Sequence, residues 1–594
     1  MDFKHILHQL QPLLNDGTLA KTCEDQDVAR HYVSSLSELA VSLRAPANRD
    51  TIRDSGVLER FLDLLNTTLD QKSIATGVIA VLSELVRCLA NCLADNGPNR
   101  SVFMSQCVLK TGLENCQLPR LLNPEIAADN DLASSLRLRS LALIKNLCLD
   151  NETYAQDCSK ILTTALFQML RSSRLDSAHE DEIDSIAMAS DLLFEFTKFS
   201  HNKVRAVEIQ ILVQLLRCVA PKAGTNAPSK DESDQEDPYG EICQLLAGTL
   251  ETIVLRNETI DFSDSAATHK LQKALLESLA TLELKANLEN KLIIMRRLVS
   301  VVGLISANKS NSNLQDQDMC YEVLQRTDGG YTAAAALIVL SNSVSSRQVA
   351  DKICDNISLG SLIKACQNFR DPVQFQGFLD LTKKLLNLSN VHDLQEPDLA
   401  LLFSELKICH DQCQYFQGLS PLVDAFLDKL IALLPGSVLR KLLAHENFKS
   451  VIIERGGIAS ALLLDKLVLQ KNGRDDKILA DLWTSVFRLH DSSVTQSQGV
   501  STPFLFQLMK SLGIYLRSLN TQDPNLVFES HSQQLSMLLD TIAPLVTKTD
   551  SASRSIHNNG RFVAGMIVNL LKDKIMTPEE AKLLESATKL LMDS

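Results

Sequence analysis

The stretch Leu89-Ala90-Asn91-Cys92-Leu93-Ala94-Asp95-Asn96 returns farther along the chain as Ile144-Lys145-Asn146-Leu147-Cys148-Leu149-Asp150-Asn151. Shorter copies follow at Leu340-Ser341-Asn342-Ser343-Val344 and Leu385-Leu386-Asn387-Leu388-Ser389. Degenerate copies fill the intervals, with the Asn position taken by Val41, Glu195, Thr252 and Val301. One motif therefore runs through roughly the first two thirds of the chain.

The spacing of this motif predicts the fold. The Asn positions are 41, 91, 146, 195, 252, 301, 342 and 387, and they are separated by 50, 55, 49, 57, 49, 41 and 45 residues. A period of roughly 40–47 residues is typical of stacked helical repeats of the armadillo or HEAT kind, with the longer intervals holding loop insertions. We therefore predict an all-α, armadillo/HEAT-like right-handed superhelical solenoid, a fold that presents a long binding surface.

Composition and charge narrow the classes of partner. The 594 residues include 72 acidic and 59 basic side chains, which gives a formal net charge of −13. Proteins that bind nucleic acid show clustered Lys and Arg, and no such cluster is present, so we predict no nucleic-acid partner. An acidic surface favours encounter with basic partners. It also keeps a long protein soluble, and the sequence leaves both explanations open.

Cysteine usage and hydropathy indicate the compartment. The 14 cysteines are scattered, several of them within apolar helical stretches, which is typical of free thiols in a reducing compartment. The segment Cys409-His410-Asp411-Gln412-Cys413 lacks the second ligand pair that structural zinc requires, so we predict no metal. The N-terminus has no signal-peptide core, and the longest apolar runs are shorter than a membrane span. We expect a cytoplasmic protein without an integral membrane segment, with access to the nucleus left open.

The chain is predicted to fall into four sections. Armadillo repeats occupy residues 1–220 and 241–400, an acidic disordered loop lies between them at 221–240, and divergent helical repeats with a C-terminal cap fill 401–594. The loop holds five acidic residues and few apolar ones, so it cannot bury enough surface to fold. A second loop is expected at 309–329. The last helix is expected to begin at Pro578, with Thr577 as its N-cap.

No conventional catalytic constellation occurs in the sequence. A Walker-type phosphate loop, a His-Glu-x-x-His metal motif and a nucleophile elbow are all missing from it. We therefore predict a protein that is not an enzyme and uses no cofactor. Guanine-nucleotide exchange stays open, because it requires only tighter binding to the nucleotide-free form of a GTPase.

These repeats resemble armadillo repeats over about residues 30–400, through the helix ending Leu-x-Asn-Leu followed by Asp-Asn or Asn-Arg. Within that superfamily the chain resembles the SmgGDS-like small-GTPase dissociation stimulators, and most closely their fungal bud-emergence branch. Leu10-Gln11-Pro12-Leu13-Leu14-Asn15 and the run from Leu39 to Asp50 support this. The resemblance implies binding to Rho-family small GTPases, often through their polybasic C-terminal tails, and roles in nucleotide dissociation, chaperoning and cell polarity.

The resemblance also implies a binding groove. In armadillo proteins the Asn of the long helix faces the concave groove and holds partner main chain, which carried over by motif points to Asn91, Asn146, Asn342 and Asn387. An amide offers both a donor and an acceptor for such pairing. It can equally bond its neighbouring helices, and the sequence leaves both open.

Departures from the armadillo pattern indicate which kind of groove to expect. Four positions of the Asn series are not Asn, and Trp483 is the single Trp, so a nuclear-import type of groove is disfavoured. Glu195, with the acidic run of residues 180–184 before it, is a candidate contact for Lys or Arg side chains. A solvated loop is the alternative explanation of that run.

Three functions remain open from the sequence. The first is a GTPase-binding adaptor or chaperone that promotes nucleotide dissociation. The second is a signalling scaffold that holds kinases or exchange factors without acting on nucleotide. The third is an armadillo chaperone whose client is not a GTPase. A monomer is expected in each case, because a capped solenoid has no need to pair.

Overall fold

The computed structural model contains helices and turns, and no strand occurs among the residues it describes. The description leaves out residues 1–2, 17–18, 20–24, 72–73, 110–111, 124–129, 174–179, 200–203, 226–236, 257–259, 261, 263, 309–313, 327–328, 456, 469–480, 488–501, 519–524, 548–549 and 593–594. The all-α prediction is confirmed. Two compact units, Met1–Asn311 and Ser312–Ser594, make up the chain, and each is described by itself.

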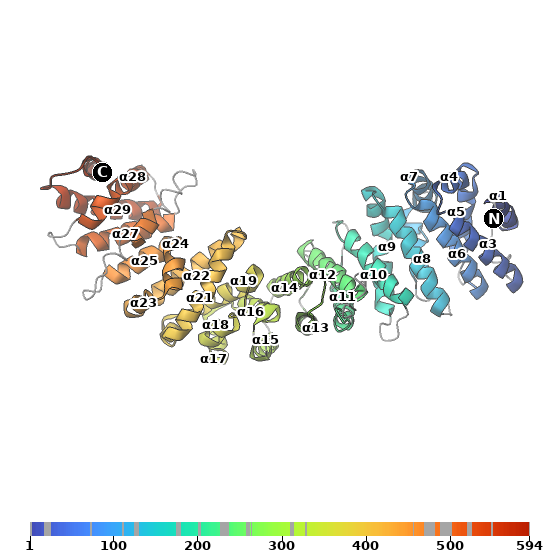
Figure 1. The fold of residues 1–594 in the computed structure, drawn as a ribbon, viewed down its shortest axis with the longest axis horizontal. Coiled ribbons are helices and arrows are strands. Elements are labelled where there is room, and N and C mark those ends of the chain that lie inside the picture. Colours follow the sequence, from blue (N-terminus) through green and yellow to red (C-terminus); the bar gives the residue numbers. More distant parts are fainter. Residues whose placement is uncertain are drawn as a thin grey trace, which may run out of the picture. The chain divides into compact units, whose positions relative to one another are not determined.

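The first unit is a two-layered stack of helices. Its elements are α1 (Phe3–Asp16), α3 (Gln26–Ser42), α4 (Pro46–Asp54), α5 (Val57–Leu69), α6 (Thr76–Leu93), α7 (Gly97–Phe103), η1 (Met104–Leu109), η2 (Leu113–Asn115), η3 (Leu118–Leu122), α8 (Asn130–Cys148), α9 (Glu152–Ser172), α10 (Glu180–Phe196), α11 (Ala206–Val219), α12 (Pro238–Arg256), α13 (Ser265–Glu283) and α14 (Lys291–Ala307). Helices α3, α6, α8, α10, α12 and α14 pack on one another in chain order, and we call them the long-helix layer (Figure 1). Helices α9, α11 and α13 pack in the same order beside them.

The second unit repeats this plan. Its elements are α15 (Leu314–Arg326), α16 (Gly330–Ser343), α17 (Arg347–Asn356), α18 (Leu359–Ala365), α19 (Pro372–Leu385), α20 (Leu388–His392), α21 (Glu396–Cys413), η6 (Gln417–Leu419), α22 (Ser420–Leu433), α23 (Gly436–Leu442), α24 (Glu446–Arg455), α25 (Gly457–Val468), α27 (Thr502–Ser518), α28 (Asn525–Ile542), η7 (Ala543–Thr547), α29 (Ser551–Leu571) and α30 (Pro578–Met592). Helices α16, α19, α22, α25, α27 and α29 pack in succession. Packing of each repeat on its neighbours confirms the solenoid architecture within each unit.

The Asp-Asn pair that ends the two best copies of the motif makes the turn out of the long helix. Asp95 and Asp150 adopt left-handed backbone angles, with φ of 48° and 55°. The Asn that follows each of them caps the next helix: the side chain of Asn96 accepts from the backbone N–H of Asn99 at 3.0 Å, and Asn151 repeats this at α9. Asp and Asn suit these positions because both tolerate left-handed angles and both cap helices well.

The Asn-Arg pair that follows the motif ties the repeats together. Asn99 donates to Cys92 O at 2.9 Å, and Arg100 Nε donates to Leu93 O at 3.0 Å, both at the end of α6. Arg100 Nη1 also donates to Leu149 O at 2.6 Å, just beyond the end of α8. The pair lies in α7. It satisfies carbonyls that the ends of two helices leave without partners.

Arg49 makes the same contacts one repeat earlier. Its Nε donates to Leu43 O at 2.8 Å, after α3, and its Nη1 donates to Ala94 O at 2.5 Å, after α6. Positive charge at helix C-termini is also favourable for the helix dipole. Arg49 and Arg100 therefore form consecutive arginine clamps, each joining the ends of two neighbouring long helices.

Some local predictions were wrong. The loop expected at 309–329 contains helix α15, which buries Met319, Cys320 and Leu324. These apolar residues recur at helical spacing, but polar neighbours obscured the pattern. Pro238–Gly240, expected in the acidic loop, begin α12, and residues 226–236 of that loop lie outside the described residues.

The acidic run at 180–184 forms the first turn of α10, where negative charge is favourable for the helix dipole, so it is not a loop. Helix α6 is, by length and composition, apolar enough to cross a membrane, with a hydropathy of 1.5, but 72% of it is buried inside the protein. Such a helix is also what the core of a repeat protein requires.

The predicted start of the last helix is confirmed. Thr577 Oγ1 accepts from the N–H of Glu580 at 3.2 Å, and Glu580 Oε2 accepts from the N–H of Thr577 at 2.8 Å. This reciprocal pair is a capping box, with Pro578 at the first helical position. The helix before it, α29, begins at Ser551 with Asp550 as its N-cap.

Candidate functional site

Asn91 and Asn146 bond the neighbouring helix of the long-helix layer. Asn91 Nδ2 donates to Ala40 O of α3 at 2.7 Å, and Asn146 Nδ2 donates to Ala90 O of α6 at 2.9 Å. Each bond uses one N–H of an amide that is half-buried. Among the described residues the structure gives the two amide oxygens no donor. Each amide therefore has a structural role in joining two helices, and its oxygen remains a hydrogen-bond acceptor.

Glu195 lies on α10 and already has a cationic partner. Its Oε1 lies 2.6 Å from Lys198 Nζ, and the same ammonium lies 4.5 Å from the centroid of the Phe194 ring. The Arg297 guanidinium of α14 lies 5.7 Å from that centroid. Cations and carboxylates alternate here, so Glu195 belongs to a mixed, charge-balanced surface and not to an isolated acidic patch.

The other interruptions of the series differ from one another in exposure. Val41 is 52% exposed, whereas Val301 is fully buried in α14. Thr252 bonds within its own helix, to Gly248 O at 2.8 Å. These positions share a layer of helices but do not present one uniform face.

In the second unit, lysines make the bonds that Asn makes in the first. Each donates its ammonium to a carbonyl near the end of the preceding helix of the stack: Lys384 to Ser341 O at 2.9 Å, Lys429 to Lys383 O at 2.6 Å and Lys466 to Ala432 O at 2.6 Å. A long ammonium side chain can reach the same carbonyls and also complements the helix dipole. In the second unit, therefore, lysines take the structural role of Asn91 and Asn146, which is to bond a carbonyl of the preceding helix.

Asn342 and Asn387 occupy different surroundings from the first pair. Asn342 is exposed near the end of α16. Asn387 lies beyond α19, which ends at Leu385, and the expectation that it belongs to the long helix was wrong. It is the N-cap of α20, where its Oδ1 accepts from Asn390 N at 2.9 Å and from Ser389 Oγ at 2.5 Å. The five predicted residues are thus divided between the two units.

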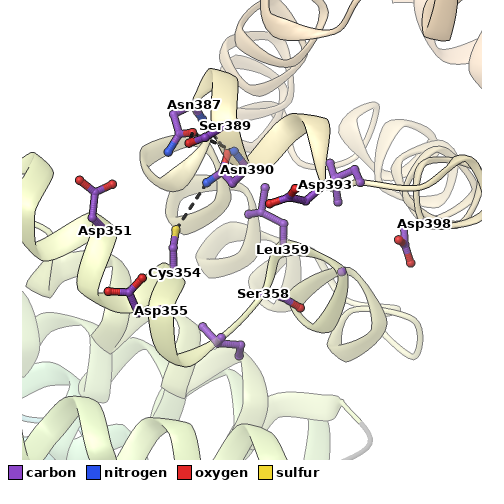
Figure 2. A pocket seen from close by; sticks show the side chains of 13 residues that line it. Asp351, Cys354, Asp355, Ser358, Leu359, Asn387, Ser389, Asn390, Asp393 and Asp398 are labelled. Atoms are coloured by element: carbon purple, nitrogen blue, oxygen red, sulfur yellow. Dashed lines mark hydrogen bonds between the residues drawn. The ribbon is translucent and has the colours of Figure 1, made fainter.

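Asn387 lines a polar cavity of about 430 Å³, shown in Figure 2. The wall comes from α17, α18, α20 and the start of α21, which are held in place by the packing of α17 on α19 and of α18 on α21. Its lining residues are Asp351, Cys354, Asp355, Ile357, Ser358, Leu359, Gly360, Asn387, Ser389, Asn390, Asp393, Leu394 and Asp398. We call it the aspartate pocket.

Charge in the aspartate pocket is of one sign. Four aspartates line it, and the lining contains no Lys, Arg or His. Asp351 pairs with Arg347 at 2.8 Å, and Asp398 accepts from the N–H of Gln395 at 3.3 Å as part of a capping box. A concave site with one sign of charge concentrates the opposite charge from solution. The pocket can therefore receive the ammonium or guanidinium group of a partner.

Amide groups order one wall of the pocket. Asn390 Nδ2 donates to Leu385 O at 2.8 Å and to Cys354 Sγ at 3.5 Å, and Figure 2 shows the latter bond. Except for Asn387, the lining was missed by the sequence analysis because its residues come from separate short helices. The available signal was the spacing of Asp351 and Asp355, which lie one helical turn apart and share a face.

A second cluster tests the prediction that the chain binds no metal. One ligand atom each of His410, Asp411 and Glu454 lie within 4.8 Å of one another. Lys407 Nζ lies 2.7 Å from Asp411 and 3.2 Å from Glu454, and His410 Nε2 lies 3.0 Å from Glu454. Burial, followed by the Arg455 charge, lowers the pKa of His410. Because cations already hold these carboxylates, the donor set does not fit a metal ion.

These features define an all-α helical-repeat protein with an acidic polar pocket and no assembled catalytic centre among the described residues. Comparison with family models places residues 1–254 in the BEM4 N-terminal domain and residues 273–590 in the BEM4 C-terminal domain. The chain therefore belongs to the BEM4 family.

A characterised relative and a solved structure complete the comparison. The chain is 33% identical to the GTPase-GDP dissociation stimulator BEM4 of Saccharomyces cerevisiae, over 98% of this chain and 99% of the relative. A solved structure titled as a conserved phosphorylation switch controlling the interaction between cadherin and beta-catenin contains a chain that matches with a TM-score of 0.44 and 12% identity, over 97% of this chain and 99% of that one. This TM-score is low, so the fold is argued from the helix packing alone.

Proposed function

We propose that this protein binds Rho-family small GTPases and promotes release of their GDP, acting as a cytoplasmic monomer in cell polarity and bud emergence. The observation that carries the proposal is the 33% identity, along almost the whole of both chains, to a protein named a GTPase-GDP dissociation stimulator. Full-length similarity means that both units are shared with that relative, and not one repeat alone.

Nucleotide release by this protein would need no covalent chemistry. A protein that binds the nucleotide-free GTPase more tightly than the GDP-bound form shifts the equilibrium towards release, by its difference in affinity for the two forms. Linkage requires the reverse effect as well, so GDP must weaken the complex by the same factor. A stack of helices suits this role, because it offers an extended surface and nucleotide release by this route requires only binding.

The aspartate pocket is our candidate contact for the basic C-terminal tail of the GTPase. Lys or Arg side chains of the tail would enter between Asp355, Asp393 and Asp398. The formal charge of −13 would assist the encounter from a distance. Both effects depend on ionic strength, so tail-dependent binding should weaken between low and physiological salt.

A pair of charge-matched variants tests the pocket. Asp355→Asn/Asp393→Asn removes two charges from the pocket, and Glu446→Gln/Glu579→Gln removes two from exposed helix N-termini elsewhere in the same unit. Equal loss of net charge separates a local contact from the long-range field. We expect the first variant to bind a full-length Rho-family GTPase about 5- to 50-fold more weakly, as for loss of one or two charged contacts of about 1–2.5 kcal/mol. The second should bind as the unchanged protein does.

Removing the tail from the GTPase completes the experiment. If the pocket holds the tail, the pocket variant and the unchanged protein should bind the truncated GTPase equally. Normal binding of the intact GTPase by the pocket variant would contradict the pocket as the contact for the tail, and would leave the proposed GDP release unaffected. Binding that ignores the nucleotide state would instead favour a signalling scaffold, and failure to bind any Rho-family GTPase would contradict the proposed function itself.

A further inference from the structure

Two cysteines meet in the last turn of α21. Cys409 is fully buried and Cys413, four residues later, is half-buried and is the final residue of the helix. The Cys413 thiol donates to Cys409 O at 3.4 Å, and the two thiols hydrogen-bond each other. The pair therefore joins a buried cysteine and a half-buried cysteine on one face of the helix.

A buried arginine from α24 completes the cluster. The Arg455 side chain is 7% exposed and is held by Asp424 Oδ1 at 2.7 Å, by Ser420 O at 3.0 Å and by Ser420 Oγ at 2.6 Å. It also hydrogen-bonds Cys413 and lies 3.3 Å from His410 Nδ1. Because residues of two helices, α21 and α22, hold the guanidinium, it presents a fixed positive charge to Cys413.

This setting separates Cys413 from the other thiols. Hydrogen bonding from Cys409, assisted by the charge of Arg455, lowers the pKa of Cys413 to about 7 against the opposing effects of burial and of Asp424. Burial instead raises the pKa of Cys243, Cys320 and other interior cysteines. The thiolate is the reactive form of cysteine, and accessible thiolates beside cations are the ones that oxidise readily.

We propose that Cys413 is a peroxide-sensitive modification site with Cys409 as its resolving thiol. In the first step the Cys413 sulfur attacks one oxygen of hydrogen peroxide. The O–O bond breaks, the other oxygen leaves as hydroxide, which takes up a proton, and Cys413 becomes a sulfenic acid. In the second step the Cys409 sulfur attacks the Cys413 sulfur, an S–S bond forms, the S–O bond breaks and water leaves. The two thiols supply the two electrons that reduce the peroxide.

The position of the pair at a helix end makes the second step feasible. Side chains four residues apart on a helix have Cβ atoms roughly 5–6 Å apart, whereas a disulfide needs roughly 3.5–4.5 Å. The last turn must therefore unwind. Unwinding must break the hydrogen bond from Gln412 Nε2 to Arg370 O, but Tyr415 and Phe416, which follow the turn, are 76% and 42% exposed. Oxidation should thus loosen the end of α21 without disturbing its buried first turns.

The experiment uses the full chain at pH 7 and mass spectrometry of its peptides. With limiting iodoacetamide, Cys413 should be alkylated several-fold faster than Cys218, an exposed cysteine of the first unit that serves as an internal control. After brief exposure to hydrogen peroxide, the peptide holding both cysteines should have lost two hydrogens. In Cys409→Ser, which cannot form the disulfide, dimedone should instead label Cys413 as a sulfenic acid.

Two results would overturn the proposal. One is alkylation of Cys218 faster than Cys413 in a protein whose circular dichroism is that of a folded helical chain. The other is peroxide treatment that yields neither the Cys409–Cys413 disulfide in the unchanged protein nor a dimedone adduct on Cys413 in Cys409→Ser. Cys218→Ser should behave as the unchanged protein does in both peroxide assays. These readouts do not involve a GTPase, so they stand apart from the proposed function.

Discussion

Removing the second arginine clamp should destabilise the first unit strongly. Arg100→Met keeps most of the apolar stem and deletes the guanidinium that bonds Leu93 O at 3.0 Å and Leu149 O at 2.6 Å. Hydrogen bonds to charged groups contribute about 1.5–3 kcal/mol each, and the residue is only 7% exposed. Allowing for partial hydration of the freed carbonyls, we expect a loss of about 3 kcal/mol in the free energy of unfolding.

The assay for this loss can distinguish the two units. Trp483, the single Trp, is buried in the second unit against Phe487 and Tyr515, so its fluorescence follows unfolding of that unit in urea. Circular dichroism at about 222 nm reports the helix content of the whole chain, so it follows unfolding of both units. Arg100→Met should lower the urea midpoint of the circular-dichroism transition and leave the Trp transition in place.

The control for this prediction is Arg30→Met. Arg30 is exposed, and its ion-pair partner among the described residues is Asp27, three residues away, so its loss should cost less than about 0.5 kcal/mol. If Arg100→Met cost no more than Arg30→Met does, the clamp would contribute little, and the account of how Asn-Arg pairs join the repeats would be wrong.

Three further predictions concern the second unit and use the same Trp483 signal. Burial, with a smaller effect from Asp424, raises the pKa of Asp428 to about 6, so folding favours its protonated form and stability is lost as pH rises through 6. Asp428→Asn should therefore raise the free energy of unfolding by about 1 kcal/mol at pH 7.5, after allowance for solvent screening, and leave it unchanged at about pH 4. An equal gain at both pH values would contradict this. A Cβ at Gly377 would lie 2.6 Å from Ile338 Cγ1 and 2.9 Å from its backbone N, so Gly377→Ala should cost about 1–3 kcal/mol. Gly565→Ala, whose Cβ would meet no other element of the described structure within 4 Å, should be neutral or stabilising, and equal effects would refute the close approach of α16 and α19. Thr577→Ala removes the N-cap of α30 and should cost about 1 kcal/mol, with Thr577→Ser restoring most of it.

The sequence predicted the repeat because its motif has a local physical cause. Asp95-Asn96 and Asp150-Asn151 turn the chain and cap the next helix through contacts between near neighbours. The same holds for Thr577 and Glu580. Such contacts join residues a few positions apart, so they produce short sequence motifs from which the turn and the helix start can be predicted.

Contacts between repeats were harder to predict. Nothing in the residues around Asn99 and Arg100 shows that Arg100 also reaches Leu149 in the next repeat. Lys384 and the other lysines of the second unit make the bonds that Asn makes in the first, and a motif defined by Asn does not include them. The aspartate pocket joins residues of separate short helices, and only their packing brings those carboxylates together.

The measurement that tests the central claim most directly is GDP release from a purified Rho-family GTPase loaded with fluorescent GDP. Addition of the full chain should accelerate GDP release in proportion to its concentration. Excess GDP should lower the affinity of the chain for the GTPase by the same factor by which the chain lowers the affinity of GDP. Unchanged release from every Rho-family GTPase tested, with no stable complex to their nucleotide-free forms, would contradict the account.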